Sequence, residues 1–264
     1  DDVESRGLGD VYKRQIYKDG YYYLFLSYGG LVAEGGYQIR IFRSENITGP
    51  YVDEAGNSAV YTSQENNLFT NIGVRIMGSY DWSGNRETRV AQGHNSAYVS
   101  EDGEIYMVYH SRFAEGKNGI TEAHEVRVQQ LFVNEAGWLV AAPYEYTGEH
   151  ISKTGYDMEQ MCGEYEFIIH TPTTYYQKAG KATVGIMQPS HITLNEDGSV
   201  TGELTGSWTY EEGSPNMTIT LEDITYQGVF LKMPSEKLYF NQKQREVVMT
   251  FTVLGNNVTA WGSK

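Results

Sequence analysis

The chain has 264 residues, which is enough for one large domain or two of medium size. Hydrophobic residues make up 40% of it, so a sizeable core is possible, and this composition argues against wholesale disorder. The formal net charge of -14 argues against a nucleic-acid partner, because phosphate recognition needs clustered Lys and Arg. An acidic chain suits a neutral ligand such as a polysaccharide.

Cysteine content and apolar runs narrow the class of protein further. Cys162 is the single cysteine, so no disulfide forms within the chain, although secreted proteins often lack disulfides and the compartment stays open. No apolar run approaches the ~20 residues needed to cross a bilayer. We therefore expect no membrane partner.

The first fifteen residues are interpreted as non-native. Residues 10–15 (DVYKRQ) resemble the translation of a transposon end used in sequencing libraries. Such a segment did not evolve with a fold, so residues 1–15 are set aside from fold reasoning. On this interpretation the native sequence begins near Ile16, partway through a domain. The alternative is an ordinary polar N-terminal arm.

Short alternating runs and turn dipeptides dominate the rest of the chain. Tyr occurs 22 times and Gly 29 times, which favours strands joined by tight turns. Asp-Gly pairs at 19–20, 102–103 and 197–198 each separate apolar or aromatic runs, a strong hairpin signal. The sequence therefore predicts an all-β fold.

Two of these hairpins resemble each other. Residues 16–27 and 98–110 both place an Asp-Gly turn before an aromatic strand, and a strand carrying arginine follows each, at 38–44 and 125–133. Repeated sheet modules are typical of a propeller. Two hairpins of a β-sandwich would give the same pattern, so periodicity alone leaves both architectures open.

A second domain is predicted after a polar link at residues 144–154, so the boundaries are 16–146 and 155–264. Antiparallel strands joined by short turns predict a small closed barrel there, which leaves no unpaired edge. The expected strands are residues 165–169, 182–187, 191–194, 206–210, 217–221, 226–231 and 247–253.

Two short motifs are candidate functional residues. The aromatic strand from Tyr21 ends in Ser27, Tyr28 and Gly29, where a glycine bend can project a hydroxyl and a ring, and such strand ends line binding sites. His94 lies between glycine and asparagine, at a loop or strand start, where its imidazole can reach a metal, a water or a substrate hydroxyl. The competing interpretation of the aromatic strand is a buried central strand with a glycine turn, and a lone histidine is a weak metal signal.

Taken together, several segments resemble glycoside hydrolase family 43, and within it the two-domain endo-1,5-α-L-arabinanases. The resemblance covers nearly everything from Ile16 to Lys264. It is carried by residues 21–30, 41–44 (IFRS), 48–53 (TGPYVD), 73–78 (GVRIMG), 92–96 (QGHNS), 163–165 (GEY) and 258–262 (VTAWG).

This resemblance implies the C-terminal part of a five-bladed β-propeller, about two blades, followed by a small lipocalin-like β-barrel. It implies cleavage of α-1,5-linked arabinan with inversion, in which one carboxylate activates water and a carboxylic acid protonates the leaving oxygen, ~6.5–9.5 Å apart. A third carboxylate orients the acid. It also implies an extracellular or cell-surface parent protein.

The sequence departs from the family where the chemistry lies. The acid Glu is expected just upstream of Ile16, and the base and orienting Asp in earlier blades, so no catalytic residue is assigned. Glu4 and Glu34 are the nearest candidates by position, but Glu4 lies in the segment interpreted as non-native and Glu34 follows the strand as a solvated loop charge. We expect this chain to be inactive by itself.

The resemblance does assign binding residues. It makes His94 the residue that helps to hold a hydrated calcium ion beneath the active site, and it makes Ser27, Tyr28 and Gly29 part of the sugar subsites.

Two other functions stay open. One is a related propeller hydrolase acting on xylan or arabinosides.

The other alternative is a non-catalytic carbohydrate-binding protein. Trp82, Trp208 or Trp261 would then stack on sugars, whereas the competing interpretation places Trp208 and Trp261 in the core or at a barrel end. The source, the oligomeric state, the choice of endo or exo action and the true N-terminus do not follow from the sequence.

Overall fold

The computed structural model describes residues 14–33, 36–60, 71–85, 87–171, 185–237 and 245–264. Glu4 and Glu34 lie outside the described residues, and so does the first half, residues 182–184, of the strand predicted at 182–187. Residues 185–187 are described and form only an isolated bridge, between Met187 and Tyr80. The described chain is all-β, as predicted, and its α3 helix has only four residues, Met158–Met161. None of the described helices is long and apolar enough to cross a membrane.

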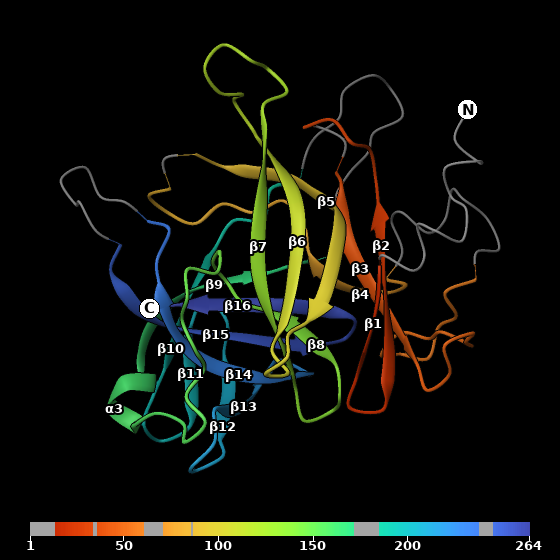
Figure 1. Cartoon of the computed structure of the whole chain (residues 1–264). Coiled ribbons are helices and arrows are strands. Elements are labelled where there is room, and N and C mark those ends of the chain that lie inside the picture. Colours follow the sequence, from red (N-terminus) through yellow and green to blue (C-terminus); the bar gives the residue numbers. More distant parts are fainter. Residues whose placement is uncertain (1–13, 34–35, 61–70, 86, 172–184, 238–244) are drawn as a thin grey trace.

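The first four strands form an antiparallel meander in chain order (Figure 1). The predicted hairpin at Asp19 and Gly20 is present, with φ of 49° and 90° at the two turn residues, and Lys18 pairs with Tyr21. Positive φ at both positions matches the twist of paired strands. The strands are β1 (Gln15–Lys18), β2 (Tyr21–Tyr28), β3 (Gln38–Ser44) and β4 (Val74–Met77).

The next four strands form a second antiparallel meander, a separate sheet that stands upright beside the first in Figure 1. Its strand β5 contacts β1, β2 and β3, so the two sheets pack together. The strands are β5 (Arg89–Val99), β6 (Ile105–Phe113), β7 (His124–Val133) and β8 (Leu139–Ala141).

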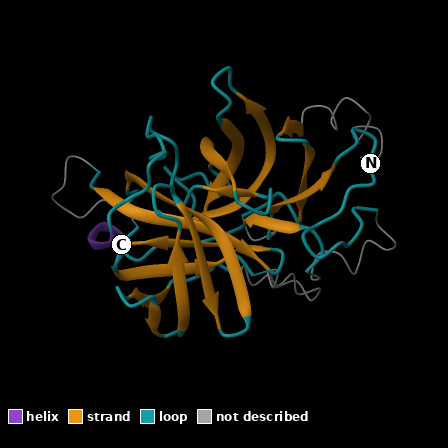
Figure 2. Ribbon diagram, turned by 90° about the horizontal axis from the view of Figure 1, so that it is seen from below, coloured by secondary structure: helices purple, strands orange, loops and turns teal. Residues whose placement is uncertain are grey.

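The remaining eight strands form a closed barrel, because β16 pairs with β9 as well as with β15. The predicted barrel is therefore present, with two strands, β11 and β16, that the sequence did not indicate. Figure 2 shows these strands from below. They are β9 (Gly163–Ile169), β10 (Ser190–Leu194), β11 (Ser199–Gly202), β12 (Gly206–Tyr210), β13 (Asn216–Leu221), β14 (Ile224–Pro234), β15 (Val247–Gly255) and β16 (Val258–Ser263).

Two large hydrophobic cores and a smaller cluster around Tyr37 form among the described residues. One fills the barrel and includes Phe167, Ile219 and Phe251. The other lies between the barrel and the two meanders, and it takes Trp261 and Leu231 from the outer face of the barrel. The barrel strands are therefore buried on both faces where they meet the rest of the chain.

Polar contacts also join the barrel to the first meander. Val258 of β16 pairs in parallel with Arg75 of β4, and the main-chain N–H of Arg75 donates to the carbonyl of Asn257 at 2.7 Å. The side-chain amide of Asn257 donates to Asp53 at 3.0 Å. These contacts extend the first meander and the barrel into one hydrogen-bonded sheet.

Candidate functional site

Ser27 and His94 lie together, although they are 67 residues apart and belong to different sheets. The main-chain N–H of His94 in β5 donates to the Ser27 hydroxyl near the end of β2, at 3.0 Å. Packing of β5 on β2 produces this contact. The structure thus brings together two residues that the sequence singled out separately.

Tyr28 and Gly29 follow Ser27 but have different environments. Tyr28 is 4% exposed, and the Arg40 guanidinium carbon lies 4.6 Å from the centroid of its ring. Its ring is therefore occupied by Arg40 rather than presented to solvent. Gly29 is exposed with φ of 88°, a backbone conformation that glycine adopts readily, and it ends the strand.

His94 lies in the middle of β5, not at the loop or strand start that we predicted. The register between β5 and β6 shifts between Gly93 and Ser96, and His94 has φ of 50°. Such a bulge re-aims a side chain, and a left-handed backbone at a non-glycine residue is a strained conformation that clusters at functional sites. The bulge leaves His94 exposed between the buried residues Gly93 and Asn95.

Gly93 is required for the packing beside His94. A Cβ atom at this position would lie 2.1 Å from Cε1 of Tyr37. The Tyr37 ring in turn lies 5.6 Å from the ring of His110, centroid to centroid. The missing side chain of Gly93 therefore lets the segment before β3 approach the second meander closely.

Three histidines follow one another across the second meander. The centroids of His94 and His110 are 6.5 Å apart, and those of His110 and His124 are 6.2 Å apart. Burial, with the nearby positive charge of Arg112 and of the two other histidines, lowers the pKa of His110 to about 4. Sequence reasoning missed this row, because only the pairing register of β5, β6 and β7 aligns the three residues.

The site does not contain a preformed metal shell. Within the described part of the chain, no three His, Cys, Asp or Glu side chains converge closely enough to hold an ion. A guanidinium nitrogen of Arg14 lies 3.5 Å from Nδ1 of His94. Calcium takes 6–8 oxygen ligands, so a calcium ion at His94 would be bound largely through water.

No described carboxylate reaches these residues. None of the described Asp or Glu side chains makes a hydrogen bond or an ion pair with Ser27 or His94. General acid–base cleavage of a glycosidic bond needs two carboxyl groups that face the substrate. The described residues around His94 can therefore position a ligand, but they supply neither the acid nor the base.

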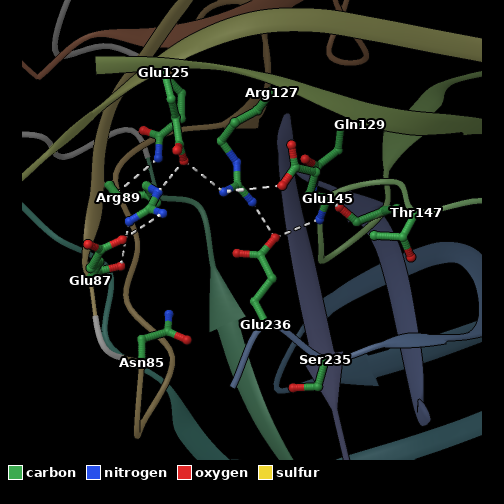
Figure 3. Close-up of polar contacts among 12 residues, drawn as sticks. Asn85, Glu87, Arg89, Glu125, Arg127, Gln129, Glu145, Thr147, Ser235 and Glu236 are labelled. Atoms are coloured by element: carbon green, nitrogen blue, oxygen red, sulfur yellow. Dashed lines mark hydrogen bonds and ion pairs between the residues drawn. The ribbon is translucent and has the colours of Figure 1, made fainter. Parts of the chain in front are cut away.

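Carboxylates gather instead in a cavity of about 460 Å³ at the junction with the barrel (Figure 3). Arg89 Nε lies 2.7 Å from Glu125, and Arg127 Nη1 lies 3.2 Å from the same carboxylate. Arg127 also pairs with Glu236, which follows β14 of the barrel. The lining residues are Asn85, Glu87, Arg89, Glu125, Arg127, Glu145, Glu236 and Arg245.

Burial and the arginine side chains together shift the pKa values of the carboxylates in this cavity. Burial would raise the pKa of Glu125, but Arg89 and Arg127 hold it below its usual value. Burial raises the pKa of Glu145, only partly offset by Arg127, and Glu236 adds to the rise. The main-chain N–H of Glu145 donates to Glu236 at 2.7 Å. Because these carboxylates bind arginines and backbone, the cavity is a joint between β7 and the barrel rather than an acid–base pair.

The three tryptophans considered as sugar platforms are all buried. Trp82 is 1% exposed, Trp208 3% and Trp261 0%. Trp208 also donates its indole N–H to the carbonyl of Asn195 at 2.8 Å. The interpretation of Trp208 and Trp261 as core residues is thus supported, and none of the three rings offers a face to a ligand.

Fold and site together define an all-β protein in which two sheet meanders carry an exposed histidine and pack on a closed barrel. Residues 14–139 match the glycosyl hydrolases family 43 profile, and residues 143–262 match the profile of a C-terminal lipocalin-like domain. The chain therefore belongs to glycosyl hydrolase family 43.

Curated relatives match this chain along most of its length. The extracellular endo-α-(1→5)-L-arabinanase 2 of Bacillus subtilis strain 168 is 40% identical over 256 residues, 92% of this chain and 50% of the relative. The extracellular endo-α-(1→5)-L-arabinanase of Thermotoga petrophila is 38% identical over 252 residues, 92% of this chain and 49% of the relative. The chain thus spans about half the length of these relatives.

Solved structures agree on the fold. The endo-1,5-α-L-arabinanase of Thermotoga petrophila superimposes with a TM-score of 0.80 at 36% identity, over 95% of this chain and 54% of that one. The family 43 YxiA protein of Bacillus licheniformis also gives 0.80, at 35% identity and the same coverage.

Proposed function

We propose that this chain is part of a glycoside hydrolase that cleaves α-1,5-linked arabinan with inversion of configuration. The observation that carries the proposal is the 40% identity, along 92% of the chain, to a relative named as an endo-arabinanase. The two meanders, β1–β4 and β5–β8, then correspond to two blades of a five-bladed propeller. The relatives named as extracellular support an extracellular parent protein.

In this proposal the chain supplies binding residues and not the catalytic pair. The contact between Ser27 and His94 supports a ligand-facing role for that corner, with Gly29 shaping its rim. Tyr28 would contribute through Arg40, which covers its ring. No described carboxylate contacts this corner, so we expect the 264-residue chain alone to leave linear arabinan intact.

The activity test compares two proteins on linear arabinan, with xylan as the second substrate. One is the 264-residue chain, and the other, the extended protein, carries the genomic upstream coding sequence in place of residues 1–15, which are interpreted as non-native. Release of arabino-oligosaccharides by the extended protein alone is the expected result. Hydrolysis by the 264-residue chain that disappears on changing one of its own Asp or Glu residues would contradict the assignment. Cleavage of xylan instead of arabinan would move the substrate to the related class.

Calcium at His94 is the second part of the proposal. The exposed imidazole on a bulged strand, without a carboxylate shell, supports a hydrated ion rather than a fully protein-coordinated one. Calorimetric titration of the extended protein with CaCl2 should show binding that His94→Ala weakens at least tenfold. The matched control is His124→Ala, which removes an exposed histidine of the same sheet. Equal calcium affinity in the His94 variant and the unaltered protein would remove His94 from the site.

A further inference from the structure

Arg75 of β4 is a fully buried cation without a hydrogen-bond partner. Its side chain has no exposed surface, and Nε, Nη1 and Nη2 all lack an acceptor. The side chain runs along its own strand, because a Cβ atom added to Gly78 would lie 1.9 Å from Nη2. The absence of a side chain at Gly78 thus makes room for the guanidinium.

The Arg75 guanidinium lies close enough to a second group of unpartnered polar atoms on the barrel for its charge to act on His170, the residue after β9. Strands β4 and β16 run parallel where Arg75 pairs with Val258, three residues before Trp261. Trp261 Nε1 is buried without a partner, and both ring nitrogens of His170 are too. The rings of His170 and Trp261 are 4.1 Å apart, centroid to centroid.

The charged groups at this junction are positive. Arg40, rather than a carboxylate, is the charged neighbour of Arg75, and burial together with Arg40 lowers the pKa of Arg75 to about 9, so it stays protonated at neutral pH. Burial and Arg75 hold the pKa of His170 well below its usual value, so its ring is neutral. None of the described Asp or Glu residues forms an ion pair with Arg75.

An uncompensated charge in this position is strongly unfavourable. Removing an ion from water is costly, and natural proteins offset this cost with a counter-charge and hydrogen bonds. Arg75 brings five N–H donors and Trp261 one, and the neutral ring of His170 has a single nitrogen that can accept. What the junction lacks is therefore a negative charge that accepts several hydrogen bonds.

We propose that this junction binds a small inorganic anion of the halide class, held by the Arg75 guanidinium with the indole N–H of Trp261 and the neutral ring of His170. A small ion suits the junction, because these nitrogens are all closed off from solvent. Its charge neutralises Arg75, and its contacts tie β4 of the first meander to β9 and β16 of the barrel. It is a structural ligand at the junction and lies outside the Ser27 and His94 corner.

The test measures thermal unfolding of the full 264-residue chain at constant ionic strength in sodium chloride, sodium bromide and sodium gluconate. Chloride and bromide should raise the Tm by a few degrees over gluconate, in a saturable manner. Arg75→Met, which keeps the length of the side chain without its charge, should abolish the difference. Arg245→Met removes an exposed arginine and should retain it.

Crystals of the unaltered protein grown in bromide give a second readout that needs no variant. An anomalous peak within hydrogen-bonding distance of the Arg75 guanidinium supports the site, even if Arg75→Met fails to fold. Equal Tm values in halide and gluconate overturn the proposal. So does a halide response that persists in Arg75→Met, or density at the junction that contains water alone.

Discussion

At the scale of single residues, the candidate site depends on backbone conformations that the neighbouring residues allow. His94 occupies a left-handed conformation at a bulge, and its N–H is held by Ser27 from another sheet. Gly93 beside it accepts the Tyr37 ring, because it has no Cβ. The exposed imidazole is thus positioned by two contacts that lie outside its own strand.

Gly93→Ala should destabilise the protein through a clash with Tyr37 and not through backbone strain. Overpacking of this kind typically costs about 1–3 kcal/mol. Urea unfolding of Gly93→Ala, of Tyr37→Ala and of the double variant measures the coupling. The cost of the Gly93 change should fall sharply in the Tyr37→Ala background, because the atoms that clash are gone. An unchanged cost in that background would show that the backbone, rather than the ring, requires glycine.

Glu125 predicts a dependence of stability on pH. Its folded-state pKa is lowered by Arg89 and Arg127, so the unfolded chain binds its proton more readily. The resulting stability is present above the usual pKa of 4.5 and is lost as the pH falls through the lower folded value. Glu125→Gln should flatten the fall in Tm between pH 5 and pH 3. Because Glu125 is partly exposed, its neutral-pH effect should stay below about 1 kcal/mol. A Tm profile identical to that of the unaltered protein would exclude this carboxylate.

At the scale of elements, the sequence predicted structure that neighbouring residues form, but not the pairing of residues far apart in the chain. The Asp-Gly turn at residues 19–20 predicted its hairpin, because its left-handed turn conformation is encoded by two adjacent residues. Strand β16 was missed, because it is buried throughout and shows no alternation of polar and apolar residues. Strand β5 was only partly recognised, because its two register shifts interrupt the pattern.

The candidate site shows the same division between local and long-range information. The residue types at Ser27 and His94 were visible in the sequence, whereas their mutual contact and the histidine row are consequences of sheet packing. The charged cavity was also invisible, because Glu236 is 109 residues from Arg127 in the sequence. Pairings across such distances are not encoded in any local pattern.

The pair formed by Arg127 and Glu236 should behave as a buried link between β7 and the barrel. The Arg127 side chain is 3% exposed, and its removal leaves Glu145 and Glu236 without their shared guanidinium. Arg127→Met should therefore destabilise by about 3 kcal/mol, as measured by urea unfolding. Adding Glu236→Gln should recover part of that loss, because it removes one of the unpaired charges. A double variant less stable than Arg127→Met would contradict the link.

At the scale of the whole molecule, the barrel and the two meanders differ in how far each can fold without the other. The barrel has its own interior core and closes on itself, so it leaves no edge unpaired. Among the described residues, the second meander ends at one edge in β8 and at the other in β5, which is bridged only at Arg89 by Tyr80, and the first meander is open at β1. Much of what stabilises the meanders is the core that they share with the outer face of the barrel.

Limited proteolysis should reveal this difference. Open strand edges and a shared core give the meanders a lower local unfolding free energy, so they should be cleaved before residues 155–264, as followed by mass spectrometry over a time course. The surviving barrel should stay folded but associate, because loss of the meanders uncovers Ile168, Leu231 and Trp261 on its outer face. Replacing Leu231 with Ser in a barrel produced separately, and comparing its elution on size exclusion with that of the unaltered barrel, tests the second step. Meanders as resistant as the barrel would show that the two halves unfold as a single cooperative unit, held together by the shared core and the junction at Arg75.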